Sequence, residues 1–155
     1  MTISRRPDIR LTLVLGIALI ATAGRPLRGE EPRPKKISFD DIKFEMSKGA
    51  AFRRSMLTPE IEKLNGKPVR IRGYILPSFQ QSGIKQFVLV RDNMQCCFGP
   101  GAALYDCVLV DMAEGKSASF TVRPVAVTGT FSIDELKGPD GKHLAIYRLA
   151  GQEVR

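Results

Sequence analysis

Five segments after residue 67 carry hydrophobic patterns that predict β-strands. The first segment alternates apolar and polar side chains, which is typical of a strand with one buried face. The second and third are short continuous apolar runs, which suit strands covered on both faces. The fourth is long and rich in β-branched side chains. The predicted strands are residues 68–77, 86–91, 107–112, 122–133 and 144–149, the last extending at most to Val154.

Two glycines, Gly73 and Gly129, interrupt otherwise regular strand patterns and indicate bulges or sharp bends. Long strands that bend at glycines allow a five-stranded sheet to coil and close on itself. We therefore predict a mostly β fold for residues 37–155: a small OB-like five-stranded barrel with one or two short N-terminal helices. A two-layer α+β sheet is the alternative.

The short helices are predicted ahead of the sheet. Over residues 37–48, apolar side chains recur at spacings of three and four, as in an amphipathic helix. A second helix would start at Thr58, whose hydroxyl can cap it, followed by Pro59 at the first helical position and the acidic Glu60. Gly66 would end it. Neither helix is long enough to be stable alone, so both must pack on the sheet.

Residues 1–23 have the three-part pattern of a secretory signal peptide. Three arginines precede an uncharged apolar run, residues 11–23, which ends in the small residues that signal peptidase requires. A membrane-spanning helix needs about 20 apolar residues, so this shorter run favours cleavage near Ala23 over a retained anchor. The mature protein is expected to be exported, in the periplasm or outside the cell.

Residues 24–36 contain three prolines and no apolar periodicity, which predicts a flexible basic linker. The whole chain has a net charge of +8, yet residues 37–155 hold 16 basic and 13 acidic side chains. Nucleic-acid-binding proteins concentrate their positive charge on the folded domain, so a nucleic-acid partner is not expected. Membrane contact would come only from an uncleaved signal or from this basic tail.

Familiar catalytic patterns are missing from the sequence, including the nucleophile elbow, the phosphate-binding loop and the zinc-protease motif. His143 is the sole histidine, which excludes a metal site built from several histidines of one chain. A Cys–His nucleophilic pair remains open. However, His143 follows a turn at residues 138–141, and a solvated turn histidine is the favoured interpretation. A non-enzymatic protein is favoured overall.

All three cysteines lie between the second and third predicted strands, in a loop that spans residues 93–107. Export would place them in an oxidising compartment, where disulfide formation is the default. Cys107 could pair with Cys96 or Cys97, whereas a bond between the two adjacent cysteines would be strained. Closing such a loop stabilises a fold by about 2–3 kcal/mol. Either pairing leaves one cysteine over.

Two functional uses of this loop remain open. Zinc or copper could be held by the three cysteines with Met94 as a thioether ligand, although a closed zinc site usually contains a Cys-x-x-Cys pair. Alternatively, a thiol of low pKa would exchange with the disulfide. Compartment and spacing favour a structural disulfide over a metal site, and a metal site over redox exchange. The predicted rim of the loop is Arg91, Tyr74, Tyr105 and Asp106.

Two stretches resemble a bacterial family of exported domains of unknown function. Residues 66–77 fit its pattern Gly-Lys-x-Val-x-Ile-x-Gly-Tyr-x-x-Pro, and residues 87–90 are similar to its Phe-Leu-Leu-Val pattern. The Cys-Cys-Phe-Gly-Pro-Gly run at residues 96–101 is similar to a subgroup among planctomycete-type secreted proteins. The resemblance spans about residues 40–150 and implies an OB-like exported domain.

The resemblance also implies a setting in the cell envelope. Some members of this family are encoded beside permeases linked to metal handling, which implies an envelope protein or transport-system component as partner. The commoner form follows its cysteine, which is Cys97 here, with His and several prolines. This chain has residues 98–101, Phe-Gly-Pro-Gly, at that place, which weakens a metal role carried over from the family.

Three functions are therefore carried forward. The leading hypothesis is an exported, non-enzymatic binding or accessory module of the cell envelope whose working surface is the loop at residues 93–107, because binding residues concentrate on loops held by rigid strands. The second is a thiol–disulfide redox protein. The third is a structural interaction scaffold in which the disulfide only stabilises the fold.

Overall fold

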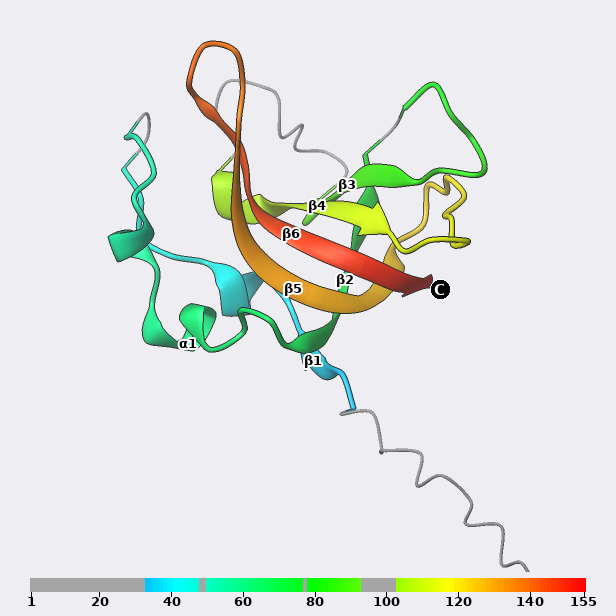
Figure 1. Cartoon of the computed structure of the whole chain (residues 1–155), viewed down its shortest axis with the longest axis horizontal. Coiled ribbons are helices and arrows are strands. Elements are labelled where there is room, and N and C mark those ends of the chain that lie inside the picture. Colours follow the sequence, from blue (N-terminus) through cyan, green and yellow to red (C-terminus); the bar gives the residue numbers. More distant parts are fainter. Residues whose placement is uncertain (1–32, 48–49, 77, 93–102) are drawn as a thin grey trace, which may run out of the picture. The chain divides into compact units, whose positions relative to one another are not determined.

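The computed structural model describes residues 33–47, 50–76, 78–92 and 103–155, and within these residues the fold is mostly β (Figure 1). One short α-helix and three single turns of 3-10 helix accompany the strands. The strands are β1 (Lys35–Ile37), β2 (Pro68–Ile75), β3 (Gln86–Val90), β4 (Cys107–Met112), β5 (Val125–Lys137) and β6 (His143–Val154). The helical elements are η1 (Phe39–Ile42), η2 (Arg54–Met56), α1 (Pro59–Glu62) and η3 (Leu104–Asp106).

Five of these strands form a closed ring of hydrogen-bonded neighbours. The order runs β2-β3-β4-β6-β5, and β5 pairs back onto β2 through six residue pairs, from Pro68 opposite Thr130 to Gly73 opposite Val125. Neighbours are antiparallel except β4 and β6, which are parallel. All five predicted strands are present in this ring. The sequence pattern did not predict β1, which pairs in parallel with the first half of β2.

Both glycines that interrupt the strand patterns lie where another backbone approaches closely. At Gly129 the pairing between β5 and β6 shifts register, so the predicted bulge is confirmed there. Gly73 interrupts no pairing. Instead, β2 changes partner after it, from β5 to β3, and a Cβ atom at this position would lie 2.5 Å from the Val90 carbonyl oxygen. Gly73 is therefore required by close packing rather than by a bulge.

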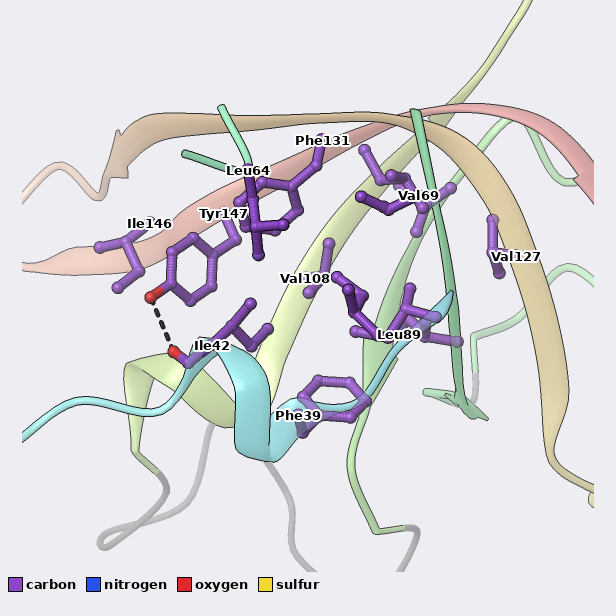
Figure 2. Packing of buried hydrophobic residues seen from close by; sticks show 14 of the residues in the cluster. Phe39, Ile42, Leu64, Val69, Leu89, Val108, Val127, Phe131, Ile146 and Tyr147 are labelled. Carbon is purple, nitrogen blue, oxygen red and sulfur yellow. Dashed lines mark hydrogen bonds between the residues drawn. The ribbon is translucent and has the colours of Figure 1, made fainter. Parts of the chain in front are cut away.

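The interior of the ring is filled by apolar side chains from every strand and from η1 and α1 (Figure 2). Tyr147 on β6 is fully buried, and its hydroxyl donates a hydrogen bond of 2.8 Å to the carbonyl oxygen of Ile42. Burial raises the pKa of this hydroxyl, so it stays a donor. The bond fixes η1 against the ring, because Ile42 is itself fully buried.

The predicted helix over residues 37–48 is wrong. Its first residue ends β1, only Phe39–Ile42 form a helical turn, and residues 43–47 are not helical. The turn starts at Ser38, whose backbone N–H and hydroxyl both donate to the Asp41 carboxylate over 2.7 Å and lower its pKa. Of the apolar residues that suggested a helix, Phe39 and Ile42 are buried in the core, and Met46 packs against the core while only partly buried.

The second predicted helix is confirmed as α1. The Thr58 hydroxyl accepts a hydrogen bond from the Ile61 N–H, and Pro59 occupies the first helical position. Gly66 follows with a positive φ of 74° and donates its N–H to the Phe131 carbonyl oxygen over 2.8 Å. The end of α1 is thereby attached to β5.

The predicted linker reached Lys36, whereas the structure places Lys35 and Lys36 in β1. The reason is long-range pairing, since Lys36 lies opposite Arg70 in the parallel ladder with β2. The predicted signal peptide, residues 1–23, and residues 24–32 of the predicted linker lie outside the described residues.

Candidate functional site

The predicted working segment starts and ends at one corner of the ring. Val90, the last residue of β3, pairs with Cys107, the first residue of β4. Beyond this pair, the Arg91 N–H donates to the Asp106 carbonyl oxygen over 3.0 Å. The antiparallel ladder therefore holds the two ends of the segment side by side.

Of the predicted sulfur ligands, the structure describes Cys107. This residue is 3% exposed, and its Sγ atom lies 3.5 Å from the carbonyl oxygen of Leu104. Met94, Cys96 and Cys97 lie outside the described residues. Such deep burial suits a packed or covalently bonded sulfur better than an accessible thiol. Within the described part of the chain, His, Cys, Asp and Glu side chains form no group of three that could hold a metal ion.

A charged cluster joins three elements at this corner. The Arg91 guanidinium forms ion pairs with Asp106 from η3 at 2.7 Å and with Asp40 from η1 at 2.9 Å. Burial lowers the pKa of Arg91, but the two carboxylates outweigh this effect and raise it. Arg91 and Asp106 were predicted as rim residues and do lie together. Asp40 was not predicted, since some fifty residues separate it from Arg91 in the sequence.

The two predicted rim tyrosines lie in different places. Tyr74 pairs with Val90, which pairs with Cys107, so these three side chains project from the same face of the sheet. Tyr105 instead packs edge-on against Phe44, with ring centroids 5.4 Å apart. The rim of the segment is therefore built from two groups: Tyr74 on the face that carries Cys107, and Tyr105 beside the segment that follows η1.

His143 is not the solvated turn histidine that its sequence position suggested. Its side chain is only 10% exposed, its Nε2 atom lies 2.8 Å from a carboxylate oxygen of Glu135, and its ring packs edge-on against Phe52 at 5.4 Å. The hydrogen bond from His143 is the main cause that lowers the pKa of Glu135. The β5–β6 hairpin brings these two residues together, because Lys137 pairs with His143 across it.

A cavity of about 550 Å³ lies beside His143. It is bounded by the chain that follows η1, by the start of η3 and by the β5–β6 hairpin. Its lining residues are Met46, Ala50, Ala51, Phe52, Leu104, Asp140, Gly141, Lys142 and His143. Leu104 belongs to the predicted working segment, so this cavity adjoins the corner described above. No sequence pattern pointed to it beyond His143 itself.

Comparison with known proteins assigns the chain to a family. A family model described as "Protein of unknown function (DUF3299)" matches residues 25–155. The chain belongs to this family. The predicted membership of a family of unknown function is thereby confirmed, while the subgroup suggested by the cysteine run stays a prediction. No curated protein matches the sequence.

The DUF3299 fold has been seen in a crystal. The chain is similar to the crystal structure of a DUF3299 family protein from Pseudomonas aeruginosa PAO1, with 18% sequence identity and a TM-score of 0.54. The match covers 78% of this chain and 94% of that one. At this identity the similarity concerns the fold alone. In the described part of this chain, no helix has the length and apolar character needed to cross a membrane.

Proposed function

We propose that this DUF3299 domain is an exported, non-enzymatic binding or accessory module of the cell envelope, with residues 93–107 as its working surface. The observation that carries the proposal is the frame of that segment. The Val90–Cys107 pair holds its ends together, and Arg91 links Asp106 to Asp40 behind them. Segments whose ends are anchored in this way on a rigid scaffold are the usual setting of binding sites.

The OB-like class is part of the same proposal. Numbered from β2, the ring has the strand order 1-2-3-5-4-1, with the third and fifth strands parallel. This order supports an OB-like arrangement. The segment at residues 93–107 connects the second and third strands of that numbering.

The burial of Cys107 bears on what its sulfur does. At 3% exposure, Cys107 suits a disulfide to Cys96 or Cys97 that stabilises the working surface. A metal site would need the buried sulfur to share one ion with the other two cysteines. A thiol–disulfide redox protein would need Cys96 or Cys97 to supply the attacking thiolate, because a buried sulfur is a poor nucleophile.

Thiol counting and metal analysis separate these three chemistries. The protein is recovered after export, denatured with and without reductant, and titrated with a thiol reagent, while the native protein is analysed for zinc and copper. We expect one reactive thiol without reductant, three with it, and no bound metal. If three thiols react without reductant and metal is bound, the cysteines form a metal site and not a disulfide. A remaining thiol that reacts rapidly in the native protein would favour redox exchange.

Site-specific photo-crosslinking tests the working surface itself. A benzophenone amino acid replaces Phe98, within the segment, and in a control protein it replaces Glu114, in the turn after β4 at the opposite end of that strand. In cells that export the protein, we expect a covalent adduct of defined mass from position 98 and none from position 114. The adduct should weaken when Arg91→Ala removes the link between Asp40 and Asp106. Equal adducts at both positions, or none at position 98, would contradict the proposed surface.

A further inference from the structure

Basic side chains gather around the edge strand β1 in two neighbouring grooves, which we call the basic face. The first groove has a volume of about 480 Å³ and the second about 520 Å³. Apolar or small residues complete the lining of both, and Glu60 is the one acidic residue among the lining residues. The basic residues are Lys36, Arg70, Arg72 and Arg155 in the first groove, and Arg33, Lys35, Lys63 and Lys67 in the second.

Strand register explains the first groove. Arg72 on β2 lies opposite Ala126 on β5, and the backbone of Ala126 in turn exchanges two hydrogen bonds with Arg155, of 2.7 and 3.0 Å. Two arginines therefore stand on either side of a residue with a small side chain. On the other side of β2, Lys36 lies opposite Arg70. Strands β1 and β2 and the C-terminal residue thus present their positive charges along one groove.

Few carboxylates neutralise the charges of the first groove. Glu153 forms an ion pair with Arg155 at 2.8 Å. Within the described residues, Lys36, Arg70 and Arg72 form no ion pair. The guanidinium groups of Arg70 and Arg72 are therefore available to an external anion, and their planar arrays of donors match the oxygen atoms of phosphate and carboxylate groups.

The basic face accounts for the whole charge excess of the domain. Residues 37–155 carry 16 basic and 13 acidic side chains. Five of these basic residues line the two grooves, and two of the acidic residues, Glu60 and Glu153, lie in or beside them, so eleven of each sign remain elsewhere. The sequence suggested that the excess belonged to the signal and a flexible tail. The structure instead joins Arg33, Lys35 and Lys36 of that tail to a positively charged face of the folded domain.

Two large apolar side chains project into solvent outside the two grooves. Phe79, in the connection from β2 to β3, is fully exposed, and Val122, just before β5, is 75% exposed. Their two connections contact each other, because the Phe120 N–H donates to the Gln81 carbonyl oxygen over 2.9 Å. Val122 lies two residues before Pro124, which lines the first groove. Figure 1 shows both connections and the C-terminus on the same side of the ring.

We propose that the basic face, together with Phe79 and Val122, is a peripheral docking surface for membranes that contain anionic phospholipids. The lysines and arginines attract the phosphate groups of the lipids, and the two apolar side chains enter the boundary between headgroups and acyl chains. This combination of basic charge and exposed apolar side chains is how proteins bind to a membrane surface without crossing it.

A lipid surface fits these observations better than a small anion does. The charges are spread over two open grooves on both sides of β1, whereas one small ligand would need them to converge. The two exposed apolar side chains have no role in binding a soluble phosphate. A membrane presents many single phosphates together with an apolar layer, and so it uses both features. The proposal is independent of the cysteines and of the working surface at residues 93–107.

Binding to vesicles tests the proposal with a matched pair of variants. Residues 24–155 contain every member of the hydrophobic core, so this chain keeps the fold and lacks the apolar segment at residues 11–23. We expect it to sediment with vesicles of phosphatidylcholine containing phosphatidylglycerol, but not with phosphatidylcholine alone. K36Q/R72Q should weaken this binding by about 30-fold, because each basic residue near the surface contributes about fivefold. K43Q/K142Q changes two exposed lysines outside the basic face and away from the connections that carry Phe79 and Val122, and should bind within about twofold of the parent chain.

Fluorescence reports the apolar contact separately. The protein contains no tryptophan, so Phe79→Trp introduces a single fluorophore on the proposed docking surface. Its emission should shift to shorter wavelength on addition of the anionic vesicles and should not shift with phosphatidylcholine alone. Leu144→Trp, on the β5–β6 hairpin and 42% exposed, is the matched control and should not respond. Circular dichroism verifies that all variants remain folded.

Several outcomes would overturn the proposal. No binding to the anionic vesicles would do so, as would equal weakening by K36Q/R72Q and K43Q/K142Q. If the Phe79→Trp variant binds the vesicles without a shift in its emission, Phe79 is not part of the docking surface. Saturable binding of inorganic pyrophosphate without binding to vesicles would replace the membrane by a soluble phosphate ligand. Failure of the cysteine experiments above changes none of these readouts.

Discussion

The hydrogen bond from Tyr147 to Ile42 is the sole link between a buried side-chain hydroxyl and a distant backbone segment among the described residues. Tyr147→Phe keeps the ring in place but leaves the buried Ile42 carbonyl oxygen without this donor. We expect the free energy of unfolding to fall by about 1–3 kcal/mol. Tyr105→Phe is the control, since its hydroxyl forms no hydrogen bond in the described structure. Denaturant unfolding of both variants measures the difference, and equal losses would show that the bond contributes little.

The Glu135–His143 pair predicts a pH dependence of stability. The hydrogen bond from His143, supported by Lys137 at 3.5 Å, lowers the pKa of Glu135 below its ordinary value of 4.5. The folded state therefore favours the ionised carboxylate. Its contribution to stability is fully present above pH 4.5 and is lost as the pH falls through the lowered folded-state pKa.

Glu135→Gln removes that contribution, because glutamine is similar in size to glutamate but carries no charge. The melting temperature of the variant should lie below that of the parent at about pH 5.5, and the gap should close as the pH falls below the lowered pKa. Thermal unfolding followed at successive pH values measures this gap. Glu114→Gln, in an exposed turn, controls for the loss of one negative charge. A gap that stays constant with pH would show that Glu135 acts only by packing.

Gly129 shows how the β5–β6 pair depends on a missing side chain. A Cβ atom at this position would collide with the backbone of Ala150 and approach that of Gly151 to 3.0 Å, where neither strand can yield without breaking the ladder. Gly129→Ala should therefore lower the free energy of unfolding by about 1–3 kcal/mol. Gly138→Ala is the matched control, because its Cβ would meet only side-chain atoms, at 3.1 Å or beyond. Chemical denaturation of the two variants should separate them clearly.

The sequence predicted elements well where the signal was local. The apolar run at residues 107–112 coincides with β4, and the start of α1 at Thr58 follows from the capping hydroxyl and the proline after it. The sequence-based prediction failed at residues 37–48. There the apolar residues have a helical spacing, but they contact the ring individually and do not form one face of a helix. A three-residue strand such as β1 cannot be predicted from its own residues, because its pairing with Val69 to Ile71 is set by the tertiary fold.

The same distinction holds for the candidate site. Arg91 and Asp106 could be predicted as neighbours because they border the same two strands. The third member of their cluster, Asp40, comes from a distant element, and the partner of His143 lies across a hairpin whose register the sequence did not specify. Charge was misassigned for a related reason. The sequence pattern placed Lys35 and Lys36 in a flexible tail, whereas in the structure they pair with β2.

The N-terminal part of the domain closes one end of the ring. Ile37, Phe39 and Ile42 are all buried, at 7%, 4% and 0% exposure, in the same cluster as the strands. Burying each of them contributes about 1.5–3 kcal/mol. Their combined loss is comparable with the whole stability of a typical domain, about 5–15 kcal/mol. The ring should therefore depend on this cover to stay folded.

That dependence predicts where the chain can be shortened. A chain that starts at residue 33 keeps all three residues, whereas one that starts at residue 43 loses them and also removes the acceptor of the Tyr147 hydroxyl. We expect residues 33–155 to unfold cooperatively near the melting temperature of residues 24–155. Residues 43–155 should show no cooperative transition and should bind a hydrophobic dye. Similar melting of both truncated chains would mean that the five-stranded ring is stable without its N-terminal cover.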